Sequence, residues 1–284
     1  MRAIVAGVDL TVMGRRVADR SAMIAESSDS ELLLVHVLEP MAEAMIDRDL
    51  ARLLRQHQIE EAGRLVEWIS ERTSAKVSLE VPKGSPSWEL ASRGKKASLV
   101  VVGSSSVDNF GVGPVSRRVA RKAVTDTLIV RRQPRVPYRR IIAAVDFSEA
   151  SRLTVDRARD LFPDADITVM FALPSRFDPL LAQAGLFQEE VQASRESRLE
   201  AANDRMAEFV SEWDNGLRTL VVDGPPSETV EEVVRRRSAD LVIVSSRGAS
   251  ATRMVLMGTV AEGLVASAPC DVMVVRGGSN FRRP

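Results

Sequence analysis

The chain has 284 residues, of which 45% are hydrophobic and 4% aromatic, and its 39 Lys and Arg are balanced by 39 Asp and Glu. This neutral balance gives no indication of a nucleic-acid or acidic-membrane partner, and the single cysteine excludes an internal disulfide framework and fits a reducing compartment. Because no apolar run approaches the ~20 residues of a membrane span and no signal-peptide pattern opens the sequence, we expect a cytoplasmic protein without a membrane span.

Short apolar runs alternate with amphipathic stretches along the first part of the chain. The pattern predicts strands at 2–8, 31–37, 76–81, 98–103 and 127–131, and helices at 15–27, 41–72, 86–96 and 114–124. Such alternation is typical of βαβ units, whose right-handed crossovers place helices on both faces of a parallel sheet.

The second part of the chain repeats the first. The segment 8–11 (Val-Asp-Leu-Thr) recurs at 145–148 (Val-Asp-Phe-Ser), and the apolar run at 99–104 recurs at 241–246. The repeated elements are strands at 139–145, 166–172, 217–222, 240–245 and 271–276, and helices at 149–161, 179–213, 226–237 and 259–267. We therefore predict an α/β protein of two tandem doubly wound domains, 1–131 and 139–284, each with a five-stranded, mostly parallel sheet.

Residues 132–138 form the predicted linker, because they contain two prolines and show no periodicity. Its arginines, with those that flank it, would suit an acidic partner, but we favour a solvated linker. The apolar segment 177–187 is open to interpretation as core helix, lid, pocket wall or subunit contact.

Ligands of doubly wound sheets bind beyond the carboxyl ends of the strands. In the second copy this region holds Asp146, the loop that begins at Ser245, and Gly258-Thr259 at a helix start. Free backbone N–H groups at a helix start favour an anion such as phosphate, and glycine lets the backbone approach its oxygens. Capping of a helix or turn is the alternative role for Asp146 and for Thr259, and it is the expected role for Asp9 in the first copy.

Other reactive residue types are sparse. His36 and His57 have no second histidine or cysteine near them in the sequence, so neither a zinc site nor a nucleophilic triad is expected. We interpret His36 as a satisfied core or edge histidine and Cys270 as a buried apolar residue. The three tryptophans lie at helical positions and are interpreted as packing residues.

The repeated Val-Asp-x-Ser/Thr, the Gly-x-Pro turns at 84–86 and 224–226, and the segment 239–248 (Ala-Asp-Leu-Val-Ile-Val-Ser-Ser-Arg-Gly) resemble the universal stress protein family in its tandem form. The resemblance covers nearly the whole chain. ATP-binding members of that family carry Gly-x2-Gly-x9-Gly-Ser/Thr after strand four. The second copy nearly keeps this motif, whereas the first has a shorter loop that ends in Gly113-Pro114, and Pro114 offers neither an N–H nor a hydroxyl.

The resemblance implies a set of nucleotide-binding residues in each copy. In the second copy, Asp146, Phe147 and Ala172 would face adenosine, and Ser245, Arg247, Gly248, Gly258, Thr259 and Val260 would surround the phosphates of ATP or AMP, with Mg2+ as an optional addition. Their equivalents in the degenerate first copy are Asp9, Val37, Gly103, Ser106 and Gly113.

The resemblance implies a stress-response binding protein that senses adenine nucleotide through its second domain, and not an enzyme. A nucleotide-independent interaction protein, or a binder of apolar ligands, is the alternative. A slow ATPase ranks last, because the chain lacks a Walker motif and a carboxylate cluster for metals. The fifth strands, 127–131 and 271–276, are expected to pair either within one chain, as an internal pseudo-dimer, or between chains in a homodimer, and the sequence identifies no protein partner.

Overall fold

The computed structural model describes residues 3–40, 47–104, 113–174, 188–213, 216–246 and 257–276. The described residues do not include the predicted helix starts at 41 and 179 or the apolar segment 177–187. None of the described helices is long and apolar enough to cross a membrane.

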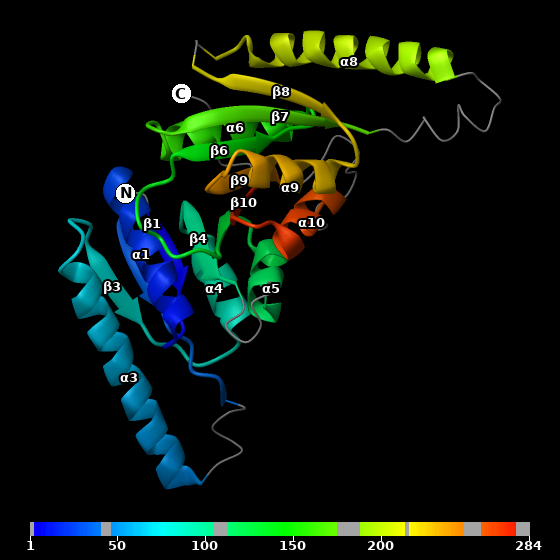
Figure 1. Cartoon of the computed structure of the whole chain (residues 1–284). Coiled ribbons are helices and arrows are strands. Elements are labelled where there is room, and N and C mark those ends of the chain that lie inside the picture. Colours follow the sequence, from blue (N-terminus) through cyan, green and yellow to red (C-terminus); the bar gives the residue numbers. More distant parts are fainter. Residues whose placement is uncertain are drawn as a thin grey trace.

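Each half alternates strands and helices in the predicted order (Figure 1). The first half contains β1 (Ala3–Gly7), α1 (Val12–Ser27), β2 (Glu31–Val35), α3 (Arg48–Ser70), β3 (Val77–Glu80), α4 (Pro86–Gly94), β4 (Leu99–Gly103), α5 (Pro114–Lys122) and β5 (Asp126–Val130). The second half contains β6 (Arg140–Ala144), α6 (Glu149–Leu161), β7 (Asp166–Leu173), α8 (Gln188–Val210), β8 (Arg218–Asp223), α9 (Pro226–Arg236), β9 (Leu241–Ser245), α10 (Thr259–Ser267) and β10 (Asp271–Val275).

The ten strands form one continuous sheet in the order β3-β2-β1-β4-β5-β10-β9-β6-β7-β8. Strands within each half are parallel, and the halves join where β5 and β10 run antiparallel, with Val272 opposite Ile129. Pairing of the fifth strands within one chain, one of the two predicted arrangements, is therefore what the structure contains. It also covers an edge that each five-stranded sheet would otherwise expose.

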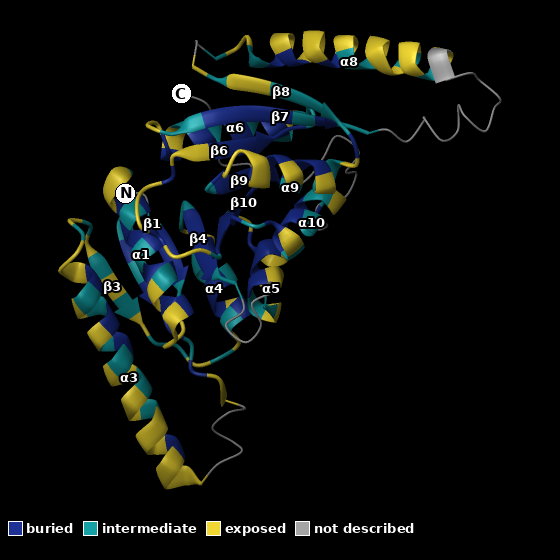
Figure 2. Ribbon diagram, viewed as in Figure 1, coloured by how far each residue is buried: buried dark blue, intermediate teal, exposed yellow. Residues whose placement is uncertain are grey.

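Two apolar cores lie on opposite faces of this sheet. One contains Val17 of α1, Ile69 of α3, Val155 of α6 and Phe209 of α8, and the other contains buried side chains of α4, α5, α9 and α10. In Figure 2 the central strands are buried, whereas α3 and α8 expose their outer faces. The predicted doubly wound α/β architecture is thus confirmed.

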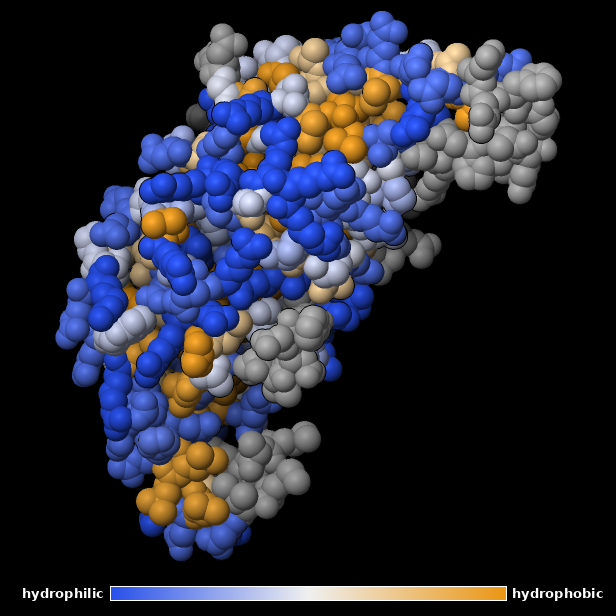
Figure 3. Space-filling view, viewed as in Figure 1, coloured by the Kyte–Doolittle hydropathy of each residue, from blue (hydrophilic) through white to orange (hydrophobic). Residues whose placement is uncertain are grey.

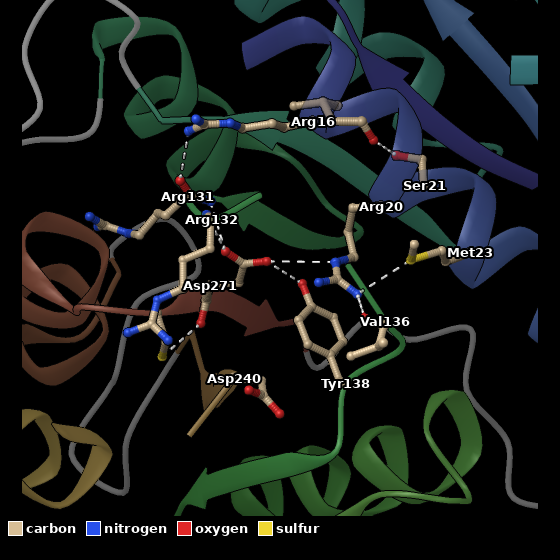
Figure 4. A network of polar contacts seen from close by, with 12 residues as sticks. Arg16, Arg20, Ser21, Met23, Arg131, Arg132, Val136, Tyr138, Asp240 and Asp271 are labelled. Atoms are coloured by element: carbon tan, nitrogen blue, oxygen red, sulfur yellow. Dashed lines mark hydrogen bonds and ion pairs between the residues drawn. The ribbon is translucent and has the colours of Figure 1, made fainter. Parts of the chain in front are cut away.

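A buried carboxylate in β10 ties the two halves together (Figure 4). Asp271 is 1% exposed, and its Oδ1 accepts hydrogen bonds from the backbone N–H groups of Arg131 (2.8 Å) and Arg132 (3.0 Å). Its Oδ2 accepts from the Tyr138 hydroxyl at 2.6 Å and lies 3.7 Å from Nε of Arg20 in α1. The prediction of a wholly solvated linker is therefore wrong at Tyr138, because this side chain packs against Arg20 and is buried.

The pseudo-equivalent carboxylate in β5 makes the reciprocal contacts. Asp126 Oδ1 accepts from the Arg276 backbone N–H at 2.7 Å, and its Oδ2 pairs with Nε of Arg157 in α6 at 2.7 Å. Each half thus supplies the cation that neutralises the other half's buried aspartate, so the contact between the halves is both apolar and electrostatically specific.

The tryptophans do not all pack as predicted. Trp88 is 65% exposed, at the start of α4, so its interpretation as a packing residue is wrong. Trp68 and Trp213 do pack against the core, and Trp213 Nε1 donates to Asp156 Oδ1 at 2.8 Å. Figure 3 shows a further apolar patch over the projecting end of α3, where Leu50, Leu53 and Leu54 are exposed.

Candidate functional site

A cavity of about 300 Å3 lies at the carboxyl ends of β6, β7 and β9 in the second half. This volume is at the lower end of the range for small-molecule sites. The cavity is lined by Ala144, Val145, Asp146, Ser151, Met170, Phe171, Ala172, Pro174, Pro226, Val230, Val244, Ser245, Gly258, Thr259, Val260 and Ala261. Of the predicted residues in the described part of this half, all except Phe147 line it.

The start of α10 forms one wall of this second-half cavity. Gly258 is the N-cap, with φ −65° and ψ 156°, and has no side chain to cap the helix. Its own N–H donates to Ser246 O at 2.9 Å, and its carbonyl accepts from Glu262 N at 2.9 Å. The N–H groups of Thr259, Val260 and Ala261 therefore have no acceptor within the helix. Thr259 is the first helical residue and not the cap, so the capping alternative is wrong for this residue.

Asp146 has a local role as well as a place in the cavity wall. Its Oδ1 accepts from Ser148 N (3.2 Å), Ser148 Oγ (2.5 Å) and Ser151 Oγ (2.6 Å), which braces the start of α6. The next residue, Phe147, has φ +62°, and its ring packs against Phe171 rather than lining the cavity.

The residue that ends strand four differs between the halves for a packing reason. At Gly103 an added Cβ would lie 2.5 Å from Cγ of Met13, so glycine makes room for a large side chain from α1. In the second half Ser245 stands at this place and is buried in the cavity wall, and the repeat sets Ala150 in place of Met13. Glycine thus stands at the strand end where the helix residue is Met, and serine stands there where the helix residue is Ala. The predicted phosphate neighbours Arg247 and Gly248 lie outside the described residues.

The first half has a cavity of about 370 Å3 at the corresponding place, which we call the first cavity. Of the predicted residues of this half, Asp9, Val37, Gly103 and Gly113 line it, and Ser106 lies outside the described residues. Asp9 Oδ1 accepts from Thr11 N, Thr11 Oγ1 and Gly14 N at 2.5–3.1 Å, so the capping role expected for Asp9 is confirmed. Pro114 occupies the first position of α5 and removes one helix-start donor.

The first cavity also contains polar residues that the sequence analysis did not assign to a site. They are His36, Glu39 and Gln58. His36 is buried as predicted, and its Nδ1 lies 3.1 Å from Val8 O, but its Nε2 is buried without a partner among the described residues. The available signal was its position at the carboxyl end of the second strand, where such sheets place ligands. In the described segments no three His, Cys, Asp or Glu side chains are grouped to hold a metal ion.

Each half of the chain separately matches the same family of known proteins. The model of the universal stress protein family matches residues 1–131 and again 137–276. A universal stress protein of Methanocaldococcus jannaschii, MJ0531, is 26% identical over 144 residues, which cover 49% of this chain and 82% of the relative.

Solved structures that cover nearly the whole chain share its fold. The crystal structure of a universal stress protein from Archaeoglobus fulgidus superposes with a TM-score of 0.68 at 18% identity, covering 97% of this chain and 98% of that one. A universal stress protein solved in complex with cAMP is 23% identical, with a TM-score of 0.32, and covers 49% of this chain and 97% of its own.

Proposed function

This chain belongs to the universal stress protein family, whose model matches both halves, and we propose that it is a stress-response protein that binds one adenine nucleotide, ATP or AMP, in its second half. Binding, rather than turnover, is the proposed activity. The fraction of chains with this site occupied would depend on the nucleotide concentration, which the protein would sense in this way.

The start of α10 carries the proposal. Three backbone N–H groups, of Thr259, Val260 and Ala261, lack an intrahelical acceptor at the wall of the second-half cavity. They add to the positive end of the helix dipole, which favours a phosphate. The first cavity has Pro114 in place of Thr259, so one of its three donors is missing.

The remaining lining of the second-half cavity suits adenosine. It is apolar at Met170, Ala172 and Val244, and Asp146 supplies a carboxylate. A carboxylate accepts hydrogen bonds from an amino or hydroxyl group. Adenine would lie against the apolar wall, Asp146 would bond a polar group of the nucleoside, and the phosphates would reach α10.

Thr259→Pro tests the assignment of the phosphate site. Proline is tolerated at the first turn of a helix, as Pro86, Pro114 and Pro226 in this chain illustrate, so the fold should persist. A hydrogen bond to a charged group contributes about 1.5–3 kcal/mol, so we expect about a 10- to 100-fold loss of affinity in titration calorimetry with ATP, AMP and cAMP, with and without Mg2+.

Thr259→Val is the matched control, because it removes the hydroxyl and keeps the backbone N–H. It should lose less affinity than Thr259→Pro. Unchanged affinity in a folded Thr259→Pro protein would overturn the assignment of the phosphates to α10. Absence of binding to the unmodified chain would leave a nucleotide-independent interaction protein.

A further inference from the structure

Four acidic, amide or imidazole side chains line the first cavity, and one of them is buried without a hydrogen-bond partner among the described residues. They are the carboxylate of Glu39, the amide of Gln58, Oδ2 of Asp9 and Nε2 of His36. They come from different places in the chain, namely the turns after β1 and β2 and the helix α3. Buried polar groups are normally paired, so the unpaired Nε2 of His36 indicates a ligand, and the exposed carboxylates of Asp9 and Glu39 lie at the same cavity.

The tautomer of His36 follows from its contact with Val8. A carbonyl oxygen only accepts, so the 3.1 Å contact between Nδ1 and Val8 O requires that Nδ1 carries the proton. In the neutral ring Nε2 is then a lone-pair acceptor. His36 is 7% exposed, and its contact with Val8 fixes the orientation of the ring. Three of the four groups, Asp9, Glu39 and His36, are therefore acceptors.

The lining of the first cavity is unsuited to a nucleotide. Asp9 and Glu39 line it, whereas Asp146 is the sole acid among the described lining residues of the second-half cavity. Neither Lys nor Arg is present among the described residues that line the first cavity, and the helix start has lost a donor at Pro114. A polyphosphate would meet two carboxylates with fewer donors, which is electrostatically unfavourable.

The remaining walls are apolar. Met13 and Val17 of α1, Leu54 of α3, Leu90 of α4 and Val102 of β4 surround the polar groups. An ammonium group has three donors and no acceptor, so it complements carboxylates and an imidazole lone pair, while a hydrocarbon body complements the apolar walls.

We propose that the first cavity binds a small organic cation, an amine with an apolar body, independently of the nucleotide in the second half. The ammonium group would lie between Asp9, Glu39 and His36, and the body would lie against Met13 and Leu90. The two halves would then share one architecture and bind ligands of opposite charge.

The test uses 2-phenylethylamine as the probe, titrated into the full chain and followed by NMR. We expect saturable binding at one site per chain, with perturbed signals around the first cavity. 3-Phenylpropionate has a similar shape and the opposite charge, and it should bind at least about 10-fold more weakly, which corresponds to one 1.4 kcal/mol step. Equal affinity for the two probes, or no binding of the amine, would overturn the proposal.

Two neutral, nearly isosteric variants test the residues. Each variant should weaken amine binding by about 10-fold. Glu39→Gln lies at an exposed position and disturbs no core contact, and Asp9→Asn keeps an oxygen for the cap of α1. Glu60→Gln is the control, because Glu60 is an exposed acid of α3 outside the cavity lining, and it should leave the affinity unchanged.

Further outcomes separate this proposal from the proposed nucleotide site. Thr259→Pro should leave amine binding intact, whatever it does to ATP binding. If Glu39→Gln and Asp9→Asn bind the amine as well as the unmodified chain does, or if AMP displaces the amine from the first cavity of Thr259→Pro, the proposal fails.

Discussion

Asp271→Asn should destabilise the protein more than any change in a surface ion pair. The substitution keeps one side-chain oxygen for the N–H groups of Arg131 and Arg132, so the backbone of the linker stays paired. It removes the negative charge that faces Arg20, whose side chain is 6% exposed. Arg20 would then be a buried cation without the carboxylate that lies against it.

The expected magnitude follows from that burial. Both side chains are almost fully excluded from water, at 6% and 1% exposure, so solvent screening gives little relief. Breaking a buried ion pair by removing one partner costs about 3–5 kcal/mol. At about 2–4 °C per kcal/mol for a chain of this size, the melting temperature should fall by about 6–20 °C.

The assay is urea unfolding followed by circular dichroism, with calorimetry for the melting temperature. Glu262→Gln is the matched control. Glu262 of the second half pairs with Arg121 of the first half at 2.9 Å, but its side chain is 40% exposed. An exposed pair contributes about 0–1 kcal/mol. If Asp271→Asn costs no more than Glu262→Gln, the idea that buried charges hold the halves together is refuted.

Other predictions follow from burial and packing. Burial raises the pKa of the Cys270 thiol to about 12, so a thiol reagent at about pH 8 should modify the native protein far more slowly than the urea-unfolded chain, and equal rates would contradict this. Burial and Asp271 also raise the pKa of Tyr138 well above its ordinary value. Above about pH 9 the unfolded chain therefore releases the Tyr138 proton while the folded chain keeps it, so the free energy of unfolding should fall as the pH rises. The fall should be less steep in Tyr138→Phe. A flat melting temperature between about pH 8.5 and 10.5 would argue against this. Gly103→Ala should cost about 1–3 kcal/mol in urea unfolding through its clash with Met13, and it should cost much less in a Met13→Ala chain, where that side chain is already gone. An equal cost in the two backgrounds would show that the clash is not the cause.

Helix starts with a clear capping residue could be predicted closely from the sequence. α6 and α10 have the predicted bounds, because Ser148 accepts from Ser151 N at the start of α6 and Gly258 precedes α10. α1 begins at Val12 and not at 15, because Thr11 caps it and Asp9 supports the cap. Both capping residues were visible in the sequence, but β1 and α1 follow each other too closely there for the hydrophobic pattern to mark the start of the helix.

The partners across the two halves could not be predicted. Arg20 and Arg157 lie on amphipathic helices, where an arginine ordinarily indicates a solvated face. Only the joined sheet brings them to Asp271 and Asp126. The sequence therefore permitted pairing of the fifth strands within or between chains, and the homodimer stays a prediction.

The candidate site divides in the same way. Asp146, Gly258 and Thr259 were placed by the repeat and by the rule that strands end at the site, and the structure brings them to one cavity. His36 and Glu39 were missed as lining residues, because each is an isolated polar residue in the sequence. Only the fold shows that the turns after neighbouring strands converge.

The nucleotide stoichiometry of the full chain tests the central claim most directly. Freshly purified protein is denatured, the released nucleotide is identified by mass spectrometry, and the emptied, refolded chain is titrated with ATP and Mg2+. We predict one ATP or AMP per chain at saturation. Two per chain would show that Pro114 does not disable the first cavity, and no binding in the titration would contradict a nucleotide site in the second half.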